Sequence, residues 1–514
     1  MSKPPPYGII YNWDGAPHGY DETPQTMASF IDRTYAPLSD TQVGAHFWCV
    51  GEHAARWDSD VLELLGDVHG RKYESAAAYT FTENIRLMLE RGEDPQKSVI
   101  ERGHELGMHV YASVRMNDNH FDGAQISDLA TLHHTELTDL RKSHPEWLLG
   151  DKTSEWFALS WNLAIPEVRQ HRLAHVAELC RKYDWDGVEL DWQRHAFHLP
   201  EDEAYRLRYL LTDLQRAIRQ MACSLAAERG RPFHVAVRVA GTLEQCANIG
   251  YDLPTWVDEG LMDIVIPAGG AATDPSLDVA SFVSLCEGRD IAVYPGFDGS
   301  LPDSFVGPED AGVKDRLRTR AIASRYHKSG ADGIYVFNWH ANGTTRQELL
   351  NQVGSLETLS CTSKIYAATH RFIQKDGPWR GAYRIDRTLG VVPVPLQATL
   401  TEDGPTIELD IVDDVKSYTP ESLVLRLRLD QWVRGDHVLV LWDGIELANP
   451  NIEFCKISDP QGISAVRPAI WQSYALDPSI VSAGNHTVQA VLKHRNPQVA
   501  CDLVLTDLEL VIRY

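Results

Sequence analysis

The segment Asp186–His195, D-G-V-E-L-D-W-Q-R-H, alternates apolar and polar residues with the two-residue period of a β-strand. Glu189 and Asp191 would point to one face of this strand, and Val188 and Leu190 to the other. An apolar face opposite a face with two carboxylates is typical of a barrel strand that helices cover on the outside and that ends under a polar pocket on the inside. A solvated edge strand is the alternative, and the helical patterns on both sides of the segment argue against it.

Strand-like and helix-like patterns alternate over the first 360 residues of the chain. The helical patterns cover residues 26–35, 95–106, 166–183, 203–229 and 313–329. The strand-like segments cover residues 8–13, 43–50, 109–116, 186–191, 233–239, 261–267, 291–296 and 333–339. Eight strands with intervening helices predict an α/β fold, a (β/α)8 TIM barrel spanning residues 1–360.

The pattern changes after residue 360, where strand-like runs recur with no long helical pattern between them. These runs cover residues 406–412, 422–429, 437–442, 486–493 and 503–512. Turn signals such as Asp443–Gly444 separate them, so residues 361–514 are predicted to form a C-terminal all-β sandwich domain. This domain would either support the barrel or bind carbohydrate.

The formal net charge of −24 makes nucleic acid an unexpected partner and provides no attraction to an anionic membrane. The N-terminal sequence M-S-K-P-P-P-Y-G lacks the apolar core of a signal peptide, and no later segment is long and apolar enough to span a bilayer. The eight cysteines are scattered without a C-x-x-C pair, which argues against disulfides and a cysteine zinc site. We therefore expect a soluble, cytoplasmic protein.

The alternation of side chains along the strands places four charged residues inside the predicted barrel: Arg115, Glu189, Asp191 and Arg238. Isolated buried charges are costly, so these groups must pair with one another or face water in a pocket. Arg238 and Glu189 lie deeper along their strands, where an ion-pair network that stabilises the barrel is the alternative to a function. Arg115 and Asp191 lie nearer the carboxyl ends, where barrel active sites form, so a functional role is favoured there.

Four local sequences at or near these positions carry a family resemblance. They are V-R-M-N-D-N-H at 114–120, D-G-V-E-L-D-W-Q-R at 186–194, V-R-V-A at 237–240 and G-A-D-G-I-Y-V-F-N-W at 330–339. They resemble sequences of the glycosyl hydrolase family 10-like barrel proteins, a group of predicted carbohydrate enzymes. The resemblance implies an oligosaccharide substrate. It also implies an active-site cleft that contains Arg115, Asn117, Asp118, Asp191 and Arg194.

The fourth strand is also similar to the D-G-x-D-x-D-x-E signature of family 18 chitinases, but Gln193 stands in place of the proton-donating glutamate. Because glutamine cannot donate a proton in that role, chitinase-type hydrolysis is not expected. We predict instead a glycoside hydrolase with Asp191 as general acid and Asp298, after the seventh strand, as nucleophile or base. Glu189 would tune the pKa of Asp191 by its like charge.

The arginines predict the class of substrate. Arg115, Arg194 and Arg238 are expected near the pocket, and guanidinium groups bind carboxylates through paired hydrogen bonds. We therefore predict an acidic, uronic-acid-containing oligosaccharide. In the alternative interpretation, these arginines only neutralise Glu189 and Asp191.

Two other functions remain open. A dehydratase or lyase would eliminate water from a uronate, with Arg115 or Arg194 neutralising the substrate carboxylate. The residues that would act as its base are His120, His195, His340 or Tyr294. A barrel that binds glycans without catalysis is the third possibility, and Gln193 is the residue that favours it.

The remaining residues expected to bind the substrate lie at or just after strand ends. They are Asn12, Glu52, His53, His195 and His340, with Trp48 and Trp339 as stacking platforms unless they are core residues. A set of nitrogen and oxygen donors near two strand ends consists of His46, Glu52, His53, Asp118 and His120. This set matches no established metal-binding spacing, so we predict neither a metal nor another cofactor.

Overall fold

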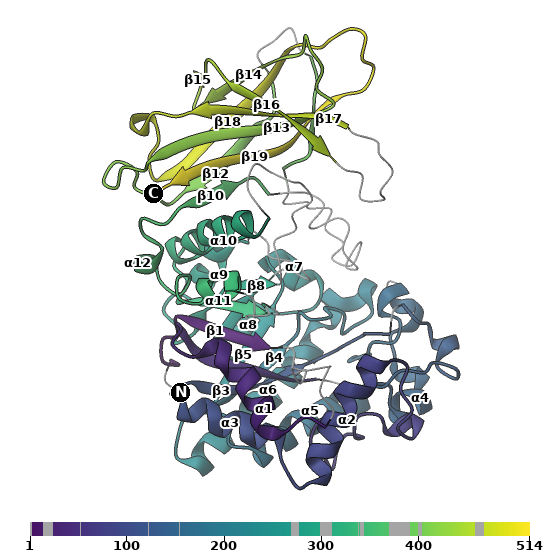
Figure 1. Ribbon diagram of the computed structural model, residues 1–514. Helices are drawn as coiled ribbons and strands as arrows, with labels where there is room; N and C mark the ends of the chain where they lie inside the picture. The colour runs from purple at the N-terminus through teal and green to yellow at the C-terminus, as the bar shows by residue number, and fades with distance from the viewer. Residues whose placement is uncertain are drawn as a thin grey trace.

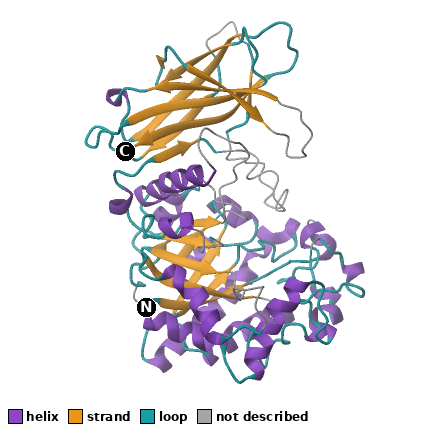
Figure 2. Cartoon of the chain, in the orientation of Figure 1, coloured by secondary structure: helices purple, strands orange, loops and turns teal. Residues whose placement is uncertain are grey.

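The computed structural model of the 514-residue chain describes residues 3–13, 24–51, 53–121, 123–153, 155–268, 277–298, 311–337, 339, 344–369, 391–398, 403–457 and 467–514. Figures 1 and 2 show two parts. The first part of the chain surrounds a parallel sheet with helices, and the C-terminal part consists mainly of antiparallel strands.

The sheet of the first part has nine parallel strands in the spatial order β7-β6-β5-β4-β3-β2-β1-β9-β8. They are β1 (Ile9–Trp13), β2 (Val43–Gly51), β3 (His109–Arg115), β4 (Gly187–Asp191), β5 (His234–Val239), β6 (Ile264–Pro267), β7 (Ala292–Val293), β8 (Gly296–Asp298) and β9 (Ile334–Phe337).

The two ends of this strand order are joined by the chain itself, because only Tyr294 and Pro295 separate β7 from β8. The Tyr294 N–H donates to the Val265 carbonyl of β6. The Pro295 carbonyl accepts a hydrogen bond from the Tyr335 N–H of β9. The sheet therefore curls until its ends meet, and this TIM-barrel-like α/β fold confirms the predicted fold class of the first part.

Helices lie around the sheet (Figure 2). They are α1 (Met27–Tyr35), α2 (Ala76–Glu90), α3 (Pro95–Glu105), α4 (Asp139–Ser143), α5 (Pro166–Lys182), α6 (Ala204–Arg229), α7 (Leu243–Asn248), α8 (Leu253–Asp258), α9 (Val279–Leu285), α10 (Ala311–Lys328), α11 (Thr344–Leu349) and α12 (Leu356–Leu359). Each predicted helical segment coincides with one of them. No described helix combines the length and the apolar composition that crossing a membrane requires.

Helix α3 illustrates how local sequence sets these boundaries. The Asp94 side chain accepts hydrogen bonds from the N–H groups of Gln96 and Lys97, and Pro95 occupies the first turn, where a missing N–H costs nothing. The chain leaves the helix near Gly107, which has a φ of +75° that favours glycine. The helix predicted at residues 95–106 is therefore confirmed.

The two faces of strand β4 separate as predicted. Val188 and Leu190 lie in the hydrophobic cluster between sheet and helices. Glu189 and Asp191 are buried and accept hydrogen bonds instead, Glu189 from Asn12 of β1 and Asp191 from Arg238 of the neighbouring β5. The inside of the barrel has a hydrophobic cluster of its own, which includes Phe47 and Phe337.

Tyrosines close the amino-terminal end of the barrel. The Tyr7 hydroxyl lies 2.6 Å from Nδ1 of His109, the first residue of β3, and 3.1 Å from the Tyr111 hydroxyl. The Tyr7 N–H donates to the Tyr294 hydroxyl at 2.9 Å. All three tyrosines are buried, so their rings fill the end of the barrel opposite to the one where β3 and β4 leave the sheet.

A glycine makes room for one of these rings, and its replacement is expected to destabilise the fold. A Cβ atom at Gly187 would lie 2.3 Å from Cε1 of Tyr111 and 2.5 Å from the His234 carbonyl oxygen. We expect Gly187→Ala to lower the free energy of unfolding by about 1–3 kcal/mol, measured by urea denaturation, because overpacking forces the ring or strand to shift. Gly44→Ala is the control, since its nearest contact would be 3.1 Å from Tyr7. Equal losses in both variants would contradict the overpacking argument.

The C-terminal part contains two antiparallel sheets. The larger sheet contains β10 (Lys364–Ala367), β11 (Val394–Leu396), β13 (Ser422–Asp430), β16 (Asn451–Ile457), β17 (Arg467–Ala475) and β19 (Leu503–Arg513). The smaller sheet contains β12 (Thr406–Ile411), β14 (His437–Trp442), β15 (Ile445–Glu446) and β18 (Gly484–His494). Every strand predicted after residue 360 falls in one of these sheets, and both sheets contribute to one hydrophobic cluster.

Helix α10 connects the two parts by charge as well as by packing. It lies against β10 in Figure 1, and its residues Lys314 and Arg318 pair with Glu509 of β19. Arg426 of β13 binds the same carboxylate, with Nη2 at 2.6 Å and Nε at 2.8 Å. Lys314 and Glu509 are fully buried, so the junction contains an ion-pair cluster that water does not screen.

Candidate functional site

The candidate site lies where strands β3 and β4 leave the barrel at their carboxyl ends. Arg115 ends β3 and Asp191 ends β4, and the two residues are register partners in the parallel sheet. The segments that follow therefore start side by side, and the Met116 N–H donates to the Asp191 carbonyl at 3.0 Å. This arrangement brings Asp118 and His120 together with Arg194 and His195, as the sequence predicted for residues after strand ends.

Asp118 is the centre of this group. Its Oδ1 atom lies 2.6 Å from His195 Nδ1 and 2.7 Å from His120 Nδ1. Its Oδ2 atom accepts a hydrogen bond from Arg115 Nη1 at 2.7 Å. Burial would raise the pKa of Asp118, but the charges of His120, Arg115 and His195 outweigh burial and hold that pKa well below its usual range. Asp118 is therefore an ionised carboxylate that fixes two imidazole rings.

His195 is neutral at physiological pH. Burial lowers the pKa of this imidazole to about 3, against the opposing effect of Asp118. Its Nδ1 atom lies 2.6 Å from Asp118 Oδ1 and accepts a hydrogen bond from the Asn119 N–H at 2.9 Å. These two contacts fix the orientation of the ring.

Arg194 connects the histidines to the barrel interior. Its Nη2 atom donates to Nε2 of His120 at 3.1 Å, and its guanidinium carbon lies 5.5 Å from the centre of the Phe337 ring. Its backbone N–H donates to Oδ1 of Asp191 at 2.9 Å. Asp191 thereby holds the start of the segment that carries Arg194 and His195.

The carboxylates of β4 lie deeper in the barrel. Arg238 of β5 donates to Oδ1 and Oδ2 of Asp191 at 3.1 and 3.2 Å, and all these groups are buried. Asn12 donates to Oε2 of Glu189 at 2.8 Å and to the Ser113 hydroxyl at 3.0 Å. This part of the barrel is thus an ion-pair and hydrogen-bond network.

Glu189 responds to the charge of its neighbour Asp191 on β4. Burial, and secondly the charge of Asp191, raise the pKa of Glu189 to about 8. Asp191 thus helps to keep a proton on Glu189 at neutral pH. The expected tuning of the pKa of Asp191 by Glu189 stays a prediction.

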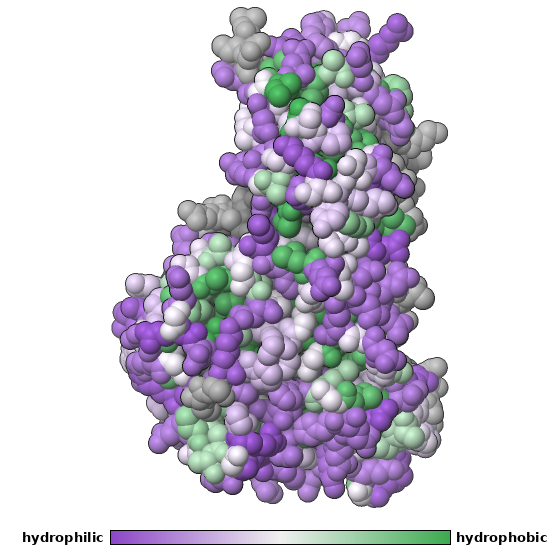
Figure 3. Space-filling view, turned by 90° about the vertical axis from the view of Figure 1, so that its left-hand side faces the viewer, coloured by the Kyte–Doolittle hydropathy of each residue, from purple (hydrophilic) through white to green (hydrophobic). Residues whose placement is uncertain are grey.

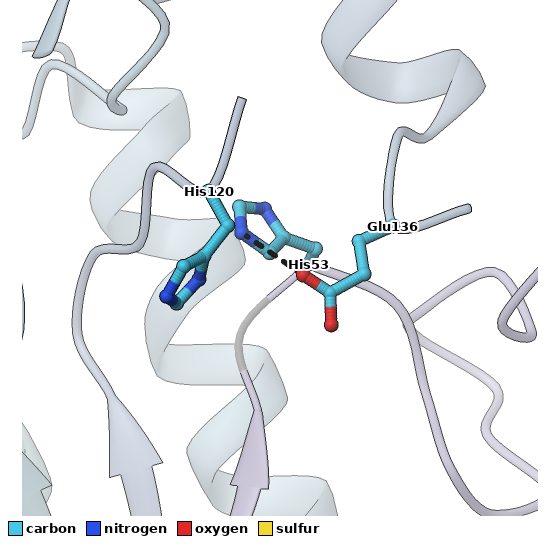
Figure 4. Close-up of side chains that lie close together, drawn as sticks. All are labelled: His53, His120 and Glu136. Atoms are coloured by element: carbon cyan, nitrogen blue, oxygen red, sulfur yellow. Dashed lines mark ion pairs between the residues drawn. The ribbon is translucent and has the colours of Figure 1, made fainter. Parts of the chain in front are cut away.

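His120 also belongs to a second group of side chains, which could hold a metal ion together. His53, just beyond β2, and Glu136, in the long connection before α5, lie beside His120 (Figure 4). His53 Nε2 is 3.9 Å from Glu136 Oε2 and also 3.9 Å from Asp118 Oδ2. Burial would raise the pKa of Glu136, but His53, Arg56 and His120 lower it overall, so this carboxylate is ionised at neutral pH.

Glu136 is the member of the site that sequence reasoning missed. The sequence shows that the connection at residues 121–162 is long and too polar to be a core segment. It contains several acidic residues, so its composition does not single out Glu136. The only local signal was the sequence H-H-T-E at 133–136. Which of these acids faces the barrel depends on how the connection packs, which a single sequence does not contain.

Other predicted site residues lie elsewhere in the structure. Asn117 donates to the carbonyls of Trp161 and Phe197 at 2.9 and 2.8 Å and therefore ties the connections together. Trp48 is 2% exposed and packs on the outer side of β2 against Phe30, and Trp339 is equally buried. Both rings occupy core positions.

Tyr294 lies at the closed amino-terminal end of the barrel, where burial raises the pKa of its hydroxyl. It is therefore separated from the histidine cluster, and its expected role as a base is not supported by its position. Glu52 and His340 lie outside the described residues, as does the side chain of Asp298 at the end of β8.

One comparison with known proteins bears on the segment that contains the site. Residues 71–209 match the model of a family described as Glycosyl hydrolase-like 10, which confirms over this segment the resemblance inferred from the motifs. The segment contains both strand ends of the site, β3 and β4, and all members of the cluster around Asp118 and His120 except His53. No curated protein matches the chain.

Two glycoside hydrolase structures resemble the chain at a low level. The GH36 α-galactosidase AgaB from Geobacillus stearothermophilus gives a TM-score of 0.36 at 13% identity, over 98% of this chain and 55% of that one. The α-amylase from Geobacillus thermoleovorans gives 0.38 at 8% identity, over 96% of this chain and 100% of that one. The chain thus spans about half the length of the α-galactosidase, and scores of this size carry no information about its reaction.

Proposed function

We propose that the protein is a glycoside hydrolase that cleaves an acidic, uronic-acid-containing oligosaccharide by carboxylate acid/base catalysis. The observation that carries this proposal is the meeting of Asp191, Arg194 and the Asp118 cluster at the carboxyl ends of β3 and β4, within the segment that matches the glycosyl hydrolase-like model. Active sites of barrel enzymes form at this end of the strands.

Arg194 supports the acidic substrate. Arg115 is paired with Asp118, and Arg238 is paired with Asp191, so these two guanidinium groups are already neutralised by protein carboxylates. Within the part of the chain that the structure describes, the Arg194 guanidinium contacts His120 and the Phe337 ring but pairs with no carboxylate. A sugar carboxylate is the ligand that this half-buried guanidinium would bind best.

Asp191 and Asp298 are the proposed pair of catalytic carboxylates. The Cα atom of Asp298 is the register partner of Phe337, and the guanidinium carbon of Arg238, which binds Asp191, lies 4.4 Å from the centre of the Phe337 ring. The ends of β4 and β8 are therefore near the same ring at the same end of the barrel. Retaining hydrolysis requires a carboxyl separation of about 5–5.5 Å and inverting hydrolysis about 6.5–9.5 Å.

The reaction is tested by mass spectrometry in water enriched in heavy oxygen, with matched acidic and neutral oligosaccharides. We expect cleavage of the acidic substrate with the label in a new reducing end. Arg194→Gln should raise the KM of the acidic substrate about tenfold or more and leave the neutral one unchanged, because a charge-assisted hydrogen bond contributes about 1.5–3 kcal/mol. Arg206→Gln is the control, since Arg206 is exposed on α6. Preference for the neutral substrate would contradict the proposed substrate class.

A dehydratase or lyase is the second candidate, and the histidine pair is the observation that favours it. His195 is held in place by Asp118, and His120 lies next to Arg194, so a ring nitrogen and a cation are close together. Proton abstraction beside a sugar carboxylate needs this combination. The product of such an enzyme would carry a new double bond that absorbs in the ultraviolet, or would be an intact sugar that has lost one water. No new reducing end would take up the heavy oxygen.

We also propose that the chain divides near residue 360 and that residues 361–514 form a β-sandwich domain whose role is to brace the barrel. The shared hydrophobic cluster of the two antiparallel sheets supports the sandwich. The buried contacts of Glu509 with Lys314 and Arg318 of α10 support the bracing role.

A further inference from the structure

We infer that His53, His120 and Glu136 bind one divalent zinc ion at the mouth of the barrel (Figure 4). This inference goes beyond the proposed hydrolysis and does not depend on it. The three residues come from different parts of the chain: the segments after β2 and β3, and the long connection before α5. Their donor atoms nevertheless lie within 4.8 Å of one another.

The spacing of the donor atoms fits a shared ion better than a hydrogen bond. His53 Nε2 and Glu136 Oε2 are 3.9 Å apart, which is too far for a hydrogen bond. Zinc binds nitrogen and oxygen at about 2.0–2.2 Å, so two of its ligands are at most about 4.2 Å apart. An ion between these atoms would therefore need only small movements of the side chains.

The Asp118 group is the less suitable of the two overlapping sets. His120 and His195 both approach one carboxylate oxygen of Asp118 to 2.7 and 2.6 Å, which are hydrogen-bond distances. Neighbouring ligands of one zinc ion, with bonds of about 2 Å, would be farther apart in a tetrahedral site. Asp118 instead holds Nδ1 of His120, which makes Nε2 the zinc ligand. Arg194 donates to that Nε2 at 3.1 Å, so its guanidinium turns away when the ion binds.

The surroundings hold the proposed ligands in position. The His53 ring packs edge-on against Phe121, with 4.9 Å between ring centres. The connection that carries Glu136 is anchored next to it, where Glu74 accepts hydrogen bonds from the Thr135 N–H and hydroxyl at 3.0 and 2.5 Å. Such contacts keep the ligand side chains close to their binding geometry before the ion binds.

The orientation of Glu136 also suits an ion between the three side chains. Arg56 contacts the Oε1 atom at 3.4 Å, so Oε2 is the oxygen that faces His53. The second carboxylate, Asp118, has its Oδ2 atom 3.9 Å from His53 Nε2, but Arg115 already pairs with that oxygen. Two imidazoles and one glutamate form the donor set of many zinc sites that keep a fourth position for water or substrate.

The test is titration of the full-length, chelator-treated protein with zinc chloride alone, followed by isothermal calorimetry. We expect one strong site, and at least about tenfold weaker binding in each of His53→Gln and Glu136→Gln, in line with the losses that follow damage to zinc sites. His144→Gln is the matched control, because His144 also pairs with a glutamate, Glu146, but belongs to neither group of possible metal ligands. Its zinc affinity should equal that of the wild type.

Failure of zinc to bind the wild type, or equal affinity in the wild type and both ligand variants, would overturn the inference. Circular dichroism of each variant distinguishes a lost site from a lost fold, and two separate ligand variants guard against misfolding of one. Since no sugar is present, the result is independent of the proposed function: zinc binding without oligosaccharide cleavage would refute the hydrolase and leave the zinc site standing.

Discussion

Asp191→Asn is expected to lower kcat for cleavage of the acidic oligosaccharide by about 10²- to 10⁴-fold, the range that one acid/base group contributes. The substitution removes the charge and the ionisable proton, yet its remaining oxygen can still accept the N–H groups of Gln193 and Arg194 that Asp191 accepts at 3.0 and 2.9 Å. The segment carrying His195 should therefore keep its path. Steady-state kinetics with the acidic substrate measure the loss.

Asp263→Asn is a closely matched control for that variant. Asp263 is a buried barrel aspartate that binds Arg219 through both oxygens at 2.7 and 2.9 Å, but it precedes β6 at the closed end of the barrel. Both variants leave an arginine without its charged partner, the buried Arg238 in one and the partly buried Arg219 in the other, and should lose stability. Only the Asp191 variant should lose kcat, and a kcat equal to that of Asp263→Asn would show that Asp191 serves the fold rather than the reaction.

Glu509→Gln is expected to lower the free energy of unfolding by about 3–5 kcal/mol, because it removes the anion from a buried cluster of cations. Burial would raise the pKa of Glu509, but Arg318, Lys314 and Arg426 outweigh burial and hold it well below its usual range. A carboxyl group with a depressed pKa stabilises the folded state above its unfolded pKa of about 4.3 and loses that contribution as pH falls. The difference between the variant and the wild type should therefore be full at pH 7 and shrink below about pH 4.

Urea denaturation at several pH values measures this effect. Glu408→Gln is the control, since Glu408 lies exposed on β12 and should change stability by less than about 0.5 kcal/mol. Because Glu509 connects β19 to α10, the variant should also separate the unfolding of the two hydrophobic cores into two transitions. A single transition with a loss below about 1 kcal/mol would contradict the role given to this junction.

The fold was largely predictable because it depends on local patterns. The alternation from Val188 to Asp191 correctly separated the outer and inner faces of β4. The predicted seventh strand at residues 291–296 instead became two short strands on either side of Tyr294 and Pro295. Proline has no N–H to donate, so Pro295 interrupts the strand.

The site was predictable only as far as strand ends determine it. Asp118, His120, Arg194 and His195 follow directly on two neighbouring strands, so topology alone brings them together. Strand parity would also have placed Trp48 outside, because its neighbour Phe47 faces the barrel interior. Glu136 depends on the packing of a long connection, and the pKa of Glu189 depends on burial, neither of which local patterns contain.

The tyrosines at the amino-terminal end have a consequence for kinetics. With Tyr7, Tyr111 and Tyr294 filling that end, a ligand can reach the candidate site only from the carboxyl ends of the strands. Substrate and product then use the same route and never pass through the molecule from one end of the barrel to the other. A product that still fits the site competes directly with the next substrate. The rate of turnover therefore depends on how quickly the product dissociates.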